Sequence, residues 1–430
     1  MLKKLFSSYL YKQSFIALFI KVLGAVMAFL FNIFLARKLG AEQTGVFYLC
    51  YTVLMIAIVF SRLGIDNVLL RNVASFNNKK RYQDLKSIFV GSMKIVLFSS
   101  LIVSLLLYFL SETLAIYLFK NPKMLNSLRL ILIAIIPYSL SLIVVAGLKG
   151  LKKIGEATII ESVVIPTFSA VVLYFMLEGA NIKDFVSSYV IGFFLLICLA
   201  FFFWERNTSF IKEKTLRVDY KKILNSSIPL LWVSAMFLVN TWADRIFLGY
   251  YSSAEDVGVY SISVKIALLV SFILGAVNSA SSAKFSEYYN NKNIQKLSYY
   301  CNKATNMMVI FSFPVLIILI IFSNKILSVF GSEFVVGSTI LTILCLAQFV
   351  NVATGSVGQI LAMSNNEKYL KKSIFAGMGV NIILNIILIP KLNMTGAALA
   401  TGISWVISTM FALYYVKKKL DFIACVFFNK

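Results

Sequence analysis

The chain has 430 residues, of which 60% are hydrophobic and 14% are charged, and its mean hydropathy is +0.85. This composition excludes an ordinary soluble globular protein and places the chain in a lipid bilayer. The net charge of +23 would suggest a nucleic-acid ligand in a soluble protein. In a membrane protein, positive charge instead marks cytoplasmic loops and contacts with anionic headgroups, so no nucleic-acid partner is expected.

Twelve apolar runs along the chain are each long enough to cross a bilayer as a helix, which takes about 20 residues. The first run is too long for a removable signal peptide, and no small-residue cleavage site follows it, so we expect it in the mature protein. The pattern predicts an all-α polytopic membrane protein. The runs are 15–36, 45–63, 88–110, 128–148, 157–177, 183–204, 228–250, 257–282, 305–329, 336–363, 370–390 and 394–416.

The distribution of lysine and arginine predicts the orientation. If the N-terminus is cytoplasmic, the inward segments hold 29 of the 41 Lys and Arg residues. This asymmetry follows the positive-inside rule, so both termini are expected in the cytoplasm. The five cysteines have no CxxC spacing and histidine is absent, so no disulfide or metal site is expected.

A repeat relates the two halves of the chain. The string "AEQTGVFY" at 41–48 returns as "AEDVGVY" at 254–260, and "NNK" at 77–79 returns at 290–292, in both cases 213 positions later. A duplication with six helices in each copy keeps the two copies in the same orientation. We therefore predict an N-lobe at 1–204 and a C-lobe at 228–416, with a basic cytoplasmic tail at 417–430.

The most polar connection, at 205–227, is the predicted cytoplasmic linker between the lobes. Ser226 and Ser227 are candidate N-caps for the next helix, and Pro229 fits its first turn.

Several charged residues fall inside or beside the apolar runs, where a charge costs about 2.5 to 3.5 kcal/mol at a helix centre. Lys21 lies near a cytoplasmic helix end and can either snorkel to the interface or line a cavity, whereas Lys265 is deeper and favours a cavity. Asp244 and Arg245 are adjacent in one helix and must point in different directions, so each needs its own partner or water.

Four further charges lie nearer to helix ends or in the inner half of a helix. Arg37, Arg62 and Asp66 are either solvated or in contact with substrate, and Glu161 either carries a coupling proton or pairs with a lysine. Cations outnumber carboxylates in the whole set, so a cavity between the lobes would be positive and would suit a phosphate-bearing substrate.

Enzymatic chemistry is not expected. The longest outward loop, at 111–127, has room for no catalytic domain, and the chain shows no Gly-rich phosphate loop, paired-carboxylate cluster or nucleophile motif.

Four stretches resemble the oligosaccharide flippases, which are Wzx-like polysaccharide export proteins of the multidrug/oligosaccharidyl-lipid/polysaccharide exporter superfamily. They are "LARKLGAEQTGVFYL" at 35–49, "SRLGIDNVLLRNVA" at 61–74, "DRIFLGYYSSAEDVGVYSIS" at 244–263 and "NIILNIILIPKLNMTGAALATGIS" at 381–404. The resemblance implies a V-shaped bundle of twelve helices in two lobes, in a bacterial inner membrane. It also implies that the repeated motifs are equivalent outer junctions, whose glutamate and glycine shape the turn and cap the following helix.

Such a protein translocates a polyprenyl-diphosphate-linked oligosaccharide, for O-antigen, capsule or another surface polysaccharide, to the outer leaflet by alternating access. The resemblance implies no cofactor beyond a coupling proton or sodium ion, and a polymerase and a chain-length regulator are the expected protein partners. The expected cavity positions are Lys21, Arg37, Arg62, Arg245 and Lys265, and the candidates for ion coupling are Asp66, Glu161 and Asp244.

Two other functions remain open. A multidrug and toxin extrusion antiporter shares the architecture but would want a carboxylate deep in helix 1, which has none, or in the C-lobe cavity, where Asp244 is the only acid near a helix interior. The other is a non-transporting scaffold for polysaccharide assembly. Polar residues within the predicted tenth and eleventh helices, such as Asn381 and Asn385, argue against a scaffold, although polar residues can also hold helices together.

Overall fold

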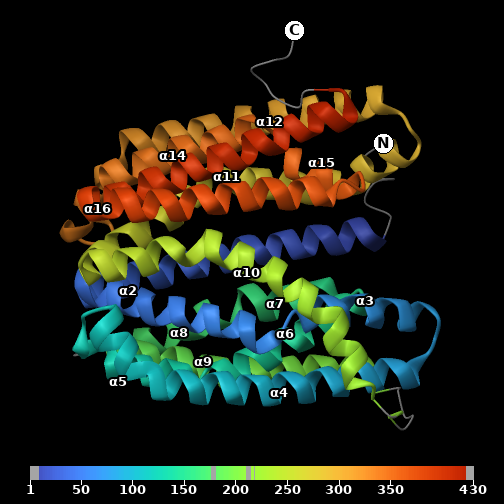
Figure 1. Ribbon diagram of the computed structural model, residues 1–430, viewed down its shortest axis with the longest axis horizontal. Helices are drawn as coiled ribbons and strands as arrows, with labels where there is room; N and C mark the ends of the chain where they lie inside the picture. Colours follow the sequence, from blue (N-terminus) through green and yellow to red (C-terminus); the bar gives the residue numbers. More distant parts are fainter. Residues whose placement is uncertain (1–8, 176–180, 210–214, 217, 423–430) are drawn as a thin grey trace. The chain divides into compact units, whose positions relative to one another are not determined.

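The computed structural model describes residues 9–175, 181–209, 215–216 and 218–422, and in these residues the regular elements are all helices (Figure 1). The all-α prediction is therefore confirmed. The helices are α2 (Tyr9–Arg62), α3 (Ile65–Asn78), α4 (Tyr82–Thr113), α5 (Leu125–Leu132), α6 (Ile135–Gly150), α7 (Ile154–Ser162), α8 (Val164–Phe175), α9 (Ile182–Thr208), α10 (Tyr220–Tyr251), α11 (Ala254–Asn290), α12 (Ile294–Ile321), α13 (Ser323–Ser328), α14 (Ser338–Ala353), α15 (Val357–Met363) and α16 (Glu367–Leu420).

Nine of the helices in the described ranges are long and apolar enough to cross a membrane, or ten if the bent pair Pro122–Leu132 and Ile135–Gly150 is one span. Helices α2 and α16 have 54 residues each, which corresponds to about 80 Å and exceeds twice the thickness of a hydrocarbon core. Each contains two of the predicted apolar runs. Each bends at one residue with non-helical backbone angles, Gly40 (φ 69°) in α2 and Asn393 (φ 48°) in α16.

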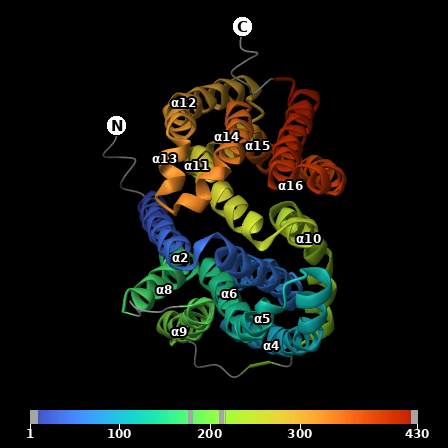
Figure 2. The ribbon, with the colours of Figure 1, turned by 90° about the vertical axis from the view of Figure 1, so that its left-hand side faces the viewer.

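Contacts group the chain into two compact units. The first comprises the residues up to Leu39 together with Val46–Leu238, and the second comprises Gly40–Gly45 and the residues from Val239 onward. In the first unit α6 packs against α3, α4 and α9, and Figure 2 shows it among α4, α5 and α9. In the second unit α11 and α14 pack against each other and against α12, and α14 also packs against α16.

The repeated motif makes a reciprocal backbone contact in the second unit. A Cβ added to Gly45 would lie 1.6 Å from the carbonyl oxygen of Ala254, and one added to Gly258 would lie 2.3 Å from the carbonyl oxygen of Ala41. Each motif thus places its alanine carbonyl against the glycine of the other motif. The Ala41 N–H also donates to Glu333 Oε2 at 2.6 Å. The glycines are therefore required for close approach of two backbones.

The predicted capping role of the motif glutamate is wrong for α11. Its N-cap is Ser253, whose hydroxyl accepts from the Asp256 N–H at 3.1 Å, while Glu255 is exposed.

The predicted start of α10 is also wrong. The helix begins at Tyr220, where Asp219 Oδ1 accepts from the Lys222 N–H at 2.9 Å. Ser226 and Ser227 donate their hydroxyls back to carbonyls within the helix, and Pro229 lies inside it. The apolar run marks where a helix enters the bilayer, and this helix extends beyond that point because its polar first turns have their own cap.

Three turns that follow helices place a lysine in the left-handed backbone region. Lys80 (φ 56°), Lys152 (φ 64°) and Lys292 (φ 55°) follow α3, α6 and α11. Each lysine N–H donates to the carbonyl three residues earlier. These are positions where glycine or asparagine is usual.

Candidate functional site

One carboxylate in the second unit is buried and surrounded by hydrogen-bond donors. Asp244 on α10 is 4% exposed. Its Oδ2 accepts from the hydroxyls of Tyr260 at 2.8 Å and Thr401 at 2.6 Å, and its Oδ1 accepts from the amides of Asn381 at 2.9 Å and Asn385 at 2.8 Å. These side chains come from α10, α11 and both arms of α16, so the carboxylate joins three helices. We call the five residues the Asp244 cluster.

The Asp244 cluster also contains an acceptor without a donor. Asn385 Oδ1 is buried and makes no hydrogen bond, while the Asn385 amide donates to both Asp244 and Asn381. A buried oxygen without a partner is costly. A carboxylate, amide oxygens and hydroxyls are the ligands that hard cations prefer, and a buried carboxylate can also take up a proton. The arrangement is thus chemically suited to a monovalent cation or a proton.

Arg245 points away from this cluster, as its position next to Asp244 predicts. It is 4% exposed, and its Nε donates to Ser261 Oγ at 3.0 Å while Nη1 donates to the Thr241 carbonyl at 3.0 Å. Its guanidinium lies 4.7 Å from the ring centroid of Trp242. Lys265 is half-buried and lies one helical turn beyond Ser261 on α11, the helix that carries this partner of Arg245. The structure therefore brings together two of the predicted cations.

The carboxylates of the first unit have a different setting. Arg62 pairs with Asp66 at 2.6 Å, one turn away on the chain, and Lys149 pairs with Glu161 at 2.8 Å. Of the two roles open to Glu161, pairing with a lysine and carrying a coupling proton, the structure shows the lysine pair. All four side chains are between 18% and 38% exposed. These are simple ion pairs, and neither resembles the Asp244 cluster.

Two predicted cations of the first unit lie on its surface. Lys21 and Arg37 on α2 are both exposed, and Lys21 is flanked by exposed apolar side chains such as Val22 and Leu23. No described contact joins either of them to the Arg62–Asp66 pair.

The first unit also has a cavity of about 410 Å³ beside the linker. The Leu216 N–H donates to Ser87 Oγ at 2.7 Å and holds the linker against α4. None of the eight predicted site residues lines this cavity. Its polar lining includes Arg71, Asn72, Asp84, Asp219 and Lys222.

Sequence reasoning missed two members of the Asp244 cluster, Tyr260 and Thr401. Asn381 and Asn385 stand out as polar residues in an apolar run, but hydroxyl-bearing residues are common in such helices. The signal that points to them is indirect, since a buried carboxylate needs donors and both lie in predicted spans.

Comparison with known proteins decides the family. Residues 10–287 match the model of the polysaccharide biosynthesis protein family, and residues 229–387 match the MatE family model. The first match covers more than half of the chain. The chain belongs to the polysaccharide biosynthesis protein family. The family resemblance seen in its motifs is thereby confirmed.

Curated relatives extend along most of the sequence. The chain is 24% identical to the "Probable low-salt glycan biosynthesis flippase Agl15" of Haloferax volcanii over 412 residues, which cover 94% of this chain and 83% of the relative. It is also 24% identical to the "Putative O-antigen transporter" of Shigella flexneri over 327 residues, covering 74% and 76% of the two chains.

Solved structures share the fold. An inward-facing MATE family multidrug resistance transporter of the MOP superfamily superposes with a TM-score of 0.75 at 12% identity, covering 95% of this chain and 98% of the other. The lipid II flippase MurJ in an inward closed conformation gives 0.74 at 18% identity, covering 93% and 87%. The chain is therefore a multi-pass membrane protein of this fold, and its family points to transport and not to catalysis.

Proposed function

We propose that the protein is a flippase that moves a polyprenyl-diphosphate-linked oligosaccharide from the cytoplasmic to the outer leaflet by alternating access. Membership of the polysaccharide biosynthesis protein family carries this proposal. Relatives named as a glycan flippase and an O-antigen transporter support it, and so does the fold shared with transporters. The cargo is a repeat unit of an O-antigen, a capsule or another surface polysaccharide.

The substrate's diphosphate is held by basic side chains in this proposal. Arg245 is the strongest candidate, because it is buried, the contacts described for it are with neutral and aromatic groups, and Lys265 lies one turn from its partner Ser261. A second positive charge beside a buried guanidinium is unfavourable unless an anion joins them. Lys21, Arg37 and Arg62 complete the proposed set.

The Asp244 cluster is the proposed site of ion coupling, with a proton or a sodium ion as the coupling ion. Uptake of either one neutralises the carboxylate and rearranges donors from three helices, which is how an ion can favour one of two conformations. Asp66 and Glu161 are weaker candidates, since each already has a cationic partner within 2.8 Å.

The prenyl chain of the substrate stays in lipid throughout. Moving its methylene groups through water would cost about 0.8 kcal/mol each. The protein acts in the cytoplasmic membrane of a bacterium with both termini in the cytoplasm, and a polymerase and a chain-length regulator are its proposed partners.

One observation favours a second candidate, a cation-exporting antiporter. The MatE family model matches residues 229–387, and the MATE transporters have the same fold. A buried carboxylate such as Asp244 is the feature by which such a transporter would hold an organic cation. The buried cation Arg245, which follows Asp244 directly on α10, disfavours a cationic substrate.

The test is deletion of the gene, followed by measurement of surface polysaccharide and of the leaflet that lipid-linked sugars occupy. We expect lipid-linked sugars to accumulate on the cytoplasmic leaflet and the surface glycan to be lost. Wild type should restore both, while Arg245→Ala and Lys265→Ala should not. Lys94→Ala, which removes an exposed lysine of α4, is the matched control and should restore both.

Unchanged lipid-linked sugars in the deletion strain would contradict the proposal. Increased sensitivity to cationic dyes in that strain would then support the antiporter. Full rescue by every charge variant would instead support a scaffold that assembles other enzymes.

A further inference from the structure

The two ends of α16 carry a group of lysines and tyrosines that the proposed function does not use. Six lysines are exposed, three in the first turns of the helix and three in the last. Because α16 bends at Asn393, its ends lie side by side. We call this surface the lysine–tyrosine patch, and it consists of Lys368, Lys371, Lys372, Lys417, Lys418, Lys419, Tyr369, Tyr414 and Tyr415.

Two of the ammonium groups share one aromatic ring. Lys368 Nζ lies 5.1 Å from the ring centroid of Tyr369, and Lys419 Nζ lies 5.0 Å from the same centroid. The two ammonium groups are therefore at most about 10 Å apart, close to the screening length of physiological salt. The Tyr415 ring packs at 4.8 Å from the Tyr369 ring. A third lysine, Lys418, lies 5.6 Å from the Tyr414 ring.

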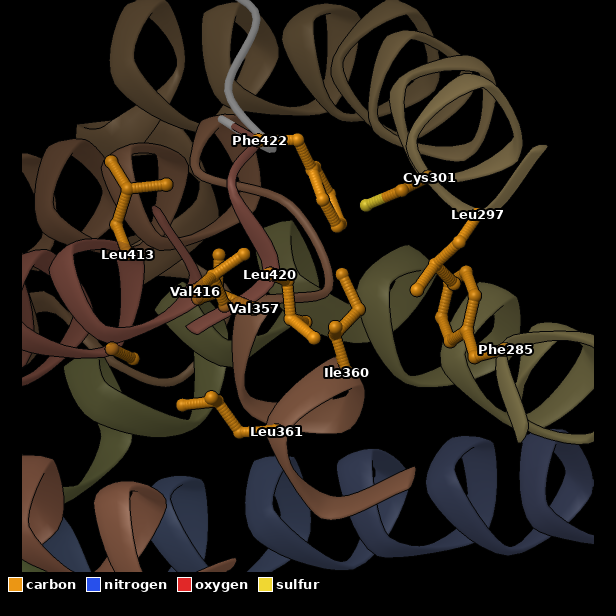
Figure 3. Packing of buried hydrophobic residues seen from close by; sticks show 11 residues of the cluster. Phe285, Leu297, Cys301, Val357, Ile360, Leu361, Leu413, Val416, Leu420 and Phe422 are labelled. Atoms are coloured by element: carbon orange, nitrogen blue, oxygen red, sulfur yellow. The ribbon is translucent and has the colours of Figure 1, made fainter. Parts of the chain in front are cut away.

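The rings rest on a hydrophobic core, so the charges are held in place. Tyr369 and Tyr415 pack against the buried cluster drawn in Figure 3, which includes Val416, Leu420 and Phe422. Rings fixed from below in this way limit how far the lysines above them can separate.

The positive charge of the patch has no carboxylate partner in the described part of the chain. None of its six lysines forms an ion pair there, and the two nearest acids along the chain, Glu367 and Asp421, are exposed. Lys368 and Lys372 are four residues apart on one helix, a spacing at which like charges destabilise. Such an arrangement is unfavourable by itself and becomes favourable when an anion is bound.

Apolar side chains identify the kind of anion. Phe375 is 56% exposed and lies one turn from Lys371 and Lys372, and Phe411 is 43% exposed and lies one turn from Tyr415. Both lie in the predicted apolar runs at 370–390 and 394–416, farther from the ends of α16 than the lysines are. A lipid can contact the lysines through its phosphate and the phenylalanines through its hydrocarbon chains. A soluble anion would contact the lysines alone and leave Phe375 and Phe411 without a ligand.

We propose that the lysine–tyrosine patch binds the phosphate headgroup of an anionic membrane phospholipid, with its acyl chains along Phe375 and Phe411. Lys368 and Lys419 contact the phosphate from both ends of α16, so a bound lipid joins the two arms of this bent helix. The site is distinct from the Asp244 cluster and does not depend on which substrate is transported.

The test measures binding of phosphatidylglycerol and of phosphatidylcholine to the purified full-length protein by native mass spectrometry. We expect phosphatidylglycerol to bind more tightly to wild type. Lys368→Gln combined with Lys419→Gln should weaken its binding about thirtyfold, since each lysine near a headgroup is worth roughly a factor of five. Lys368→Arg combined with Lys419→Arg should keep most of the affinity.

The matched control is Lys284→Gln combined with Lys296→Gln. Lys284 lies 4.9 Å from the Tyr300 ring, so this variant also removes two lysines and one cation–ring contact, but from a ring with a single cation. We expect no more than a twofold change. An unchanged melting temperature without lipid shows that each variant is folded.

Equal binding of the two lipids by wild type would overturn the proposal, and so would equal loss in the control. Release of phosphatidylglycerol by millimolar inorganic phosphate would show that a free anion occupies the patch, which also contradicts it. These readouts require no transport, so the flippase proposal and this one can fail separately.

Discussion

The two halves of the chain use equivalent positions for different chemistry. At the repeat distance of 213 residues, Asp244 and Tyr260 correspond to Phe31 and Phe47. The first pair is hydrogen-bonded at 2.8 Å, and the second is a buried ring contact with centroids 6.1 Å apart. Helix positions separated by 16 residues thus meet in both halves, through a hydrogen bond in one half and through two rings in the other.

The next positions along the chain show the same relation. Arg245 donates to Ser261, and their counterparts Asn32 and Tyr48 also form a side-chain hydrogen bond. At this offset the same positions touch in the two halves, while the residues at those positions differ. Of the four pairs of positions compared, the buried carboxylate lies in the second half, so we expect ion coupling to be a property of that half.

The largest effect on stability should come from truncating the buried ring pair of the first half, Phe31 and Phe47. Phe31→Ala removes a ring that is 1% exposed and contacts both Phe47 and Tyr189. We expect a loss of about 3 kcal/mol, since truncating a buried Phe leaves a cavity. The ion dependence of transport in proteoliposomes should stay as in wild type. A changed ion dependence would show that both halves take part in coupling.

The repeated glycines should both be sensitive to substitution, and Gly45 more so because its added Cβ would lie closer to the opposing carbonyl. Gly45→Ala and Gly258→Ala each push a methyl group into a backbone carbonyl of the other motif. Each should cost about 2 to 3 kcal/mol, the upper range for overpacking. The measurement is the yield of monodisperse protein and its melting temperature. Gly379→Ala, at a helical site with open space, is the control and should be neutral.

Asp244→Asn should lower stability by about 1 to 2 kcal/mol, because the new amide faces donors where the carboxylate accepted hydrogen bonds. Its larger consequence is functional. Transport should lose its dependence on the coupling ion, measured as flux with and without a proton or sodium gradient. Tyr260→Phe removes one donor and should leave that dependence in place.

The smallest effect is expected for Asp66→Asn. This carboxylate pairs with Arg62 one helical turn away and is partly exposed, a setting worth about 0.3 to 0.5 kcal/mol. A loss of ion dependence in this variant would contradict the assignment of coupling to the second half.

Much of the fold follows from the sequence because bilayer-spanning helices need long apolar runs. The runs at 15–36 and 45–63, and at 370–390 and 394–416, were predicted as separate helices, and each pair lies in one bent helix. For these two helices the sequence does not predict that the paired runs continue as one bent helix. The residue at each bend has an unusual backbone angle set by tertiary contacts, and a local pattern does not reveal it.

The site was harder to predict than the fold. The different directions of Asp244 and Arg245 follow from helix geometry alone. The partners of Asp244 did not, because the sequence says which residues share a helix face but not which faces meet. Thr401 is 157 residues from Asp244 along the chain, and no local pattern links them.

Three of the four lysines with left-handed backbone lie in predicted inward-facing turns, and the fourth, Lys120 (φ 49°), lies in the predicted outward loop at 111–127. A non-glycine residue in this conformation costs roughly 1 kcal/mol or more, yet Lys80, Lys152 and Lys292 each follow a helix in a predicted inward-facing turn. Glycine at these positions would relieve the strain and remove three charges that keep these turns from crossing the bilayer during synthesis. These three turns thus combine a strained backbone with positive charges that favour a cytoplasmic location.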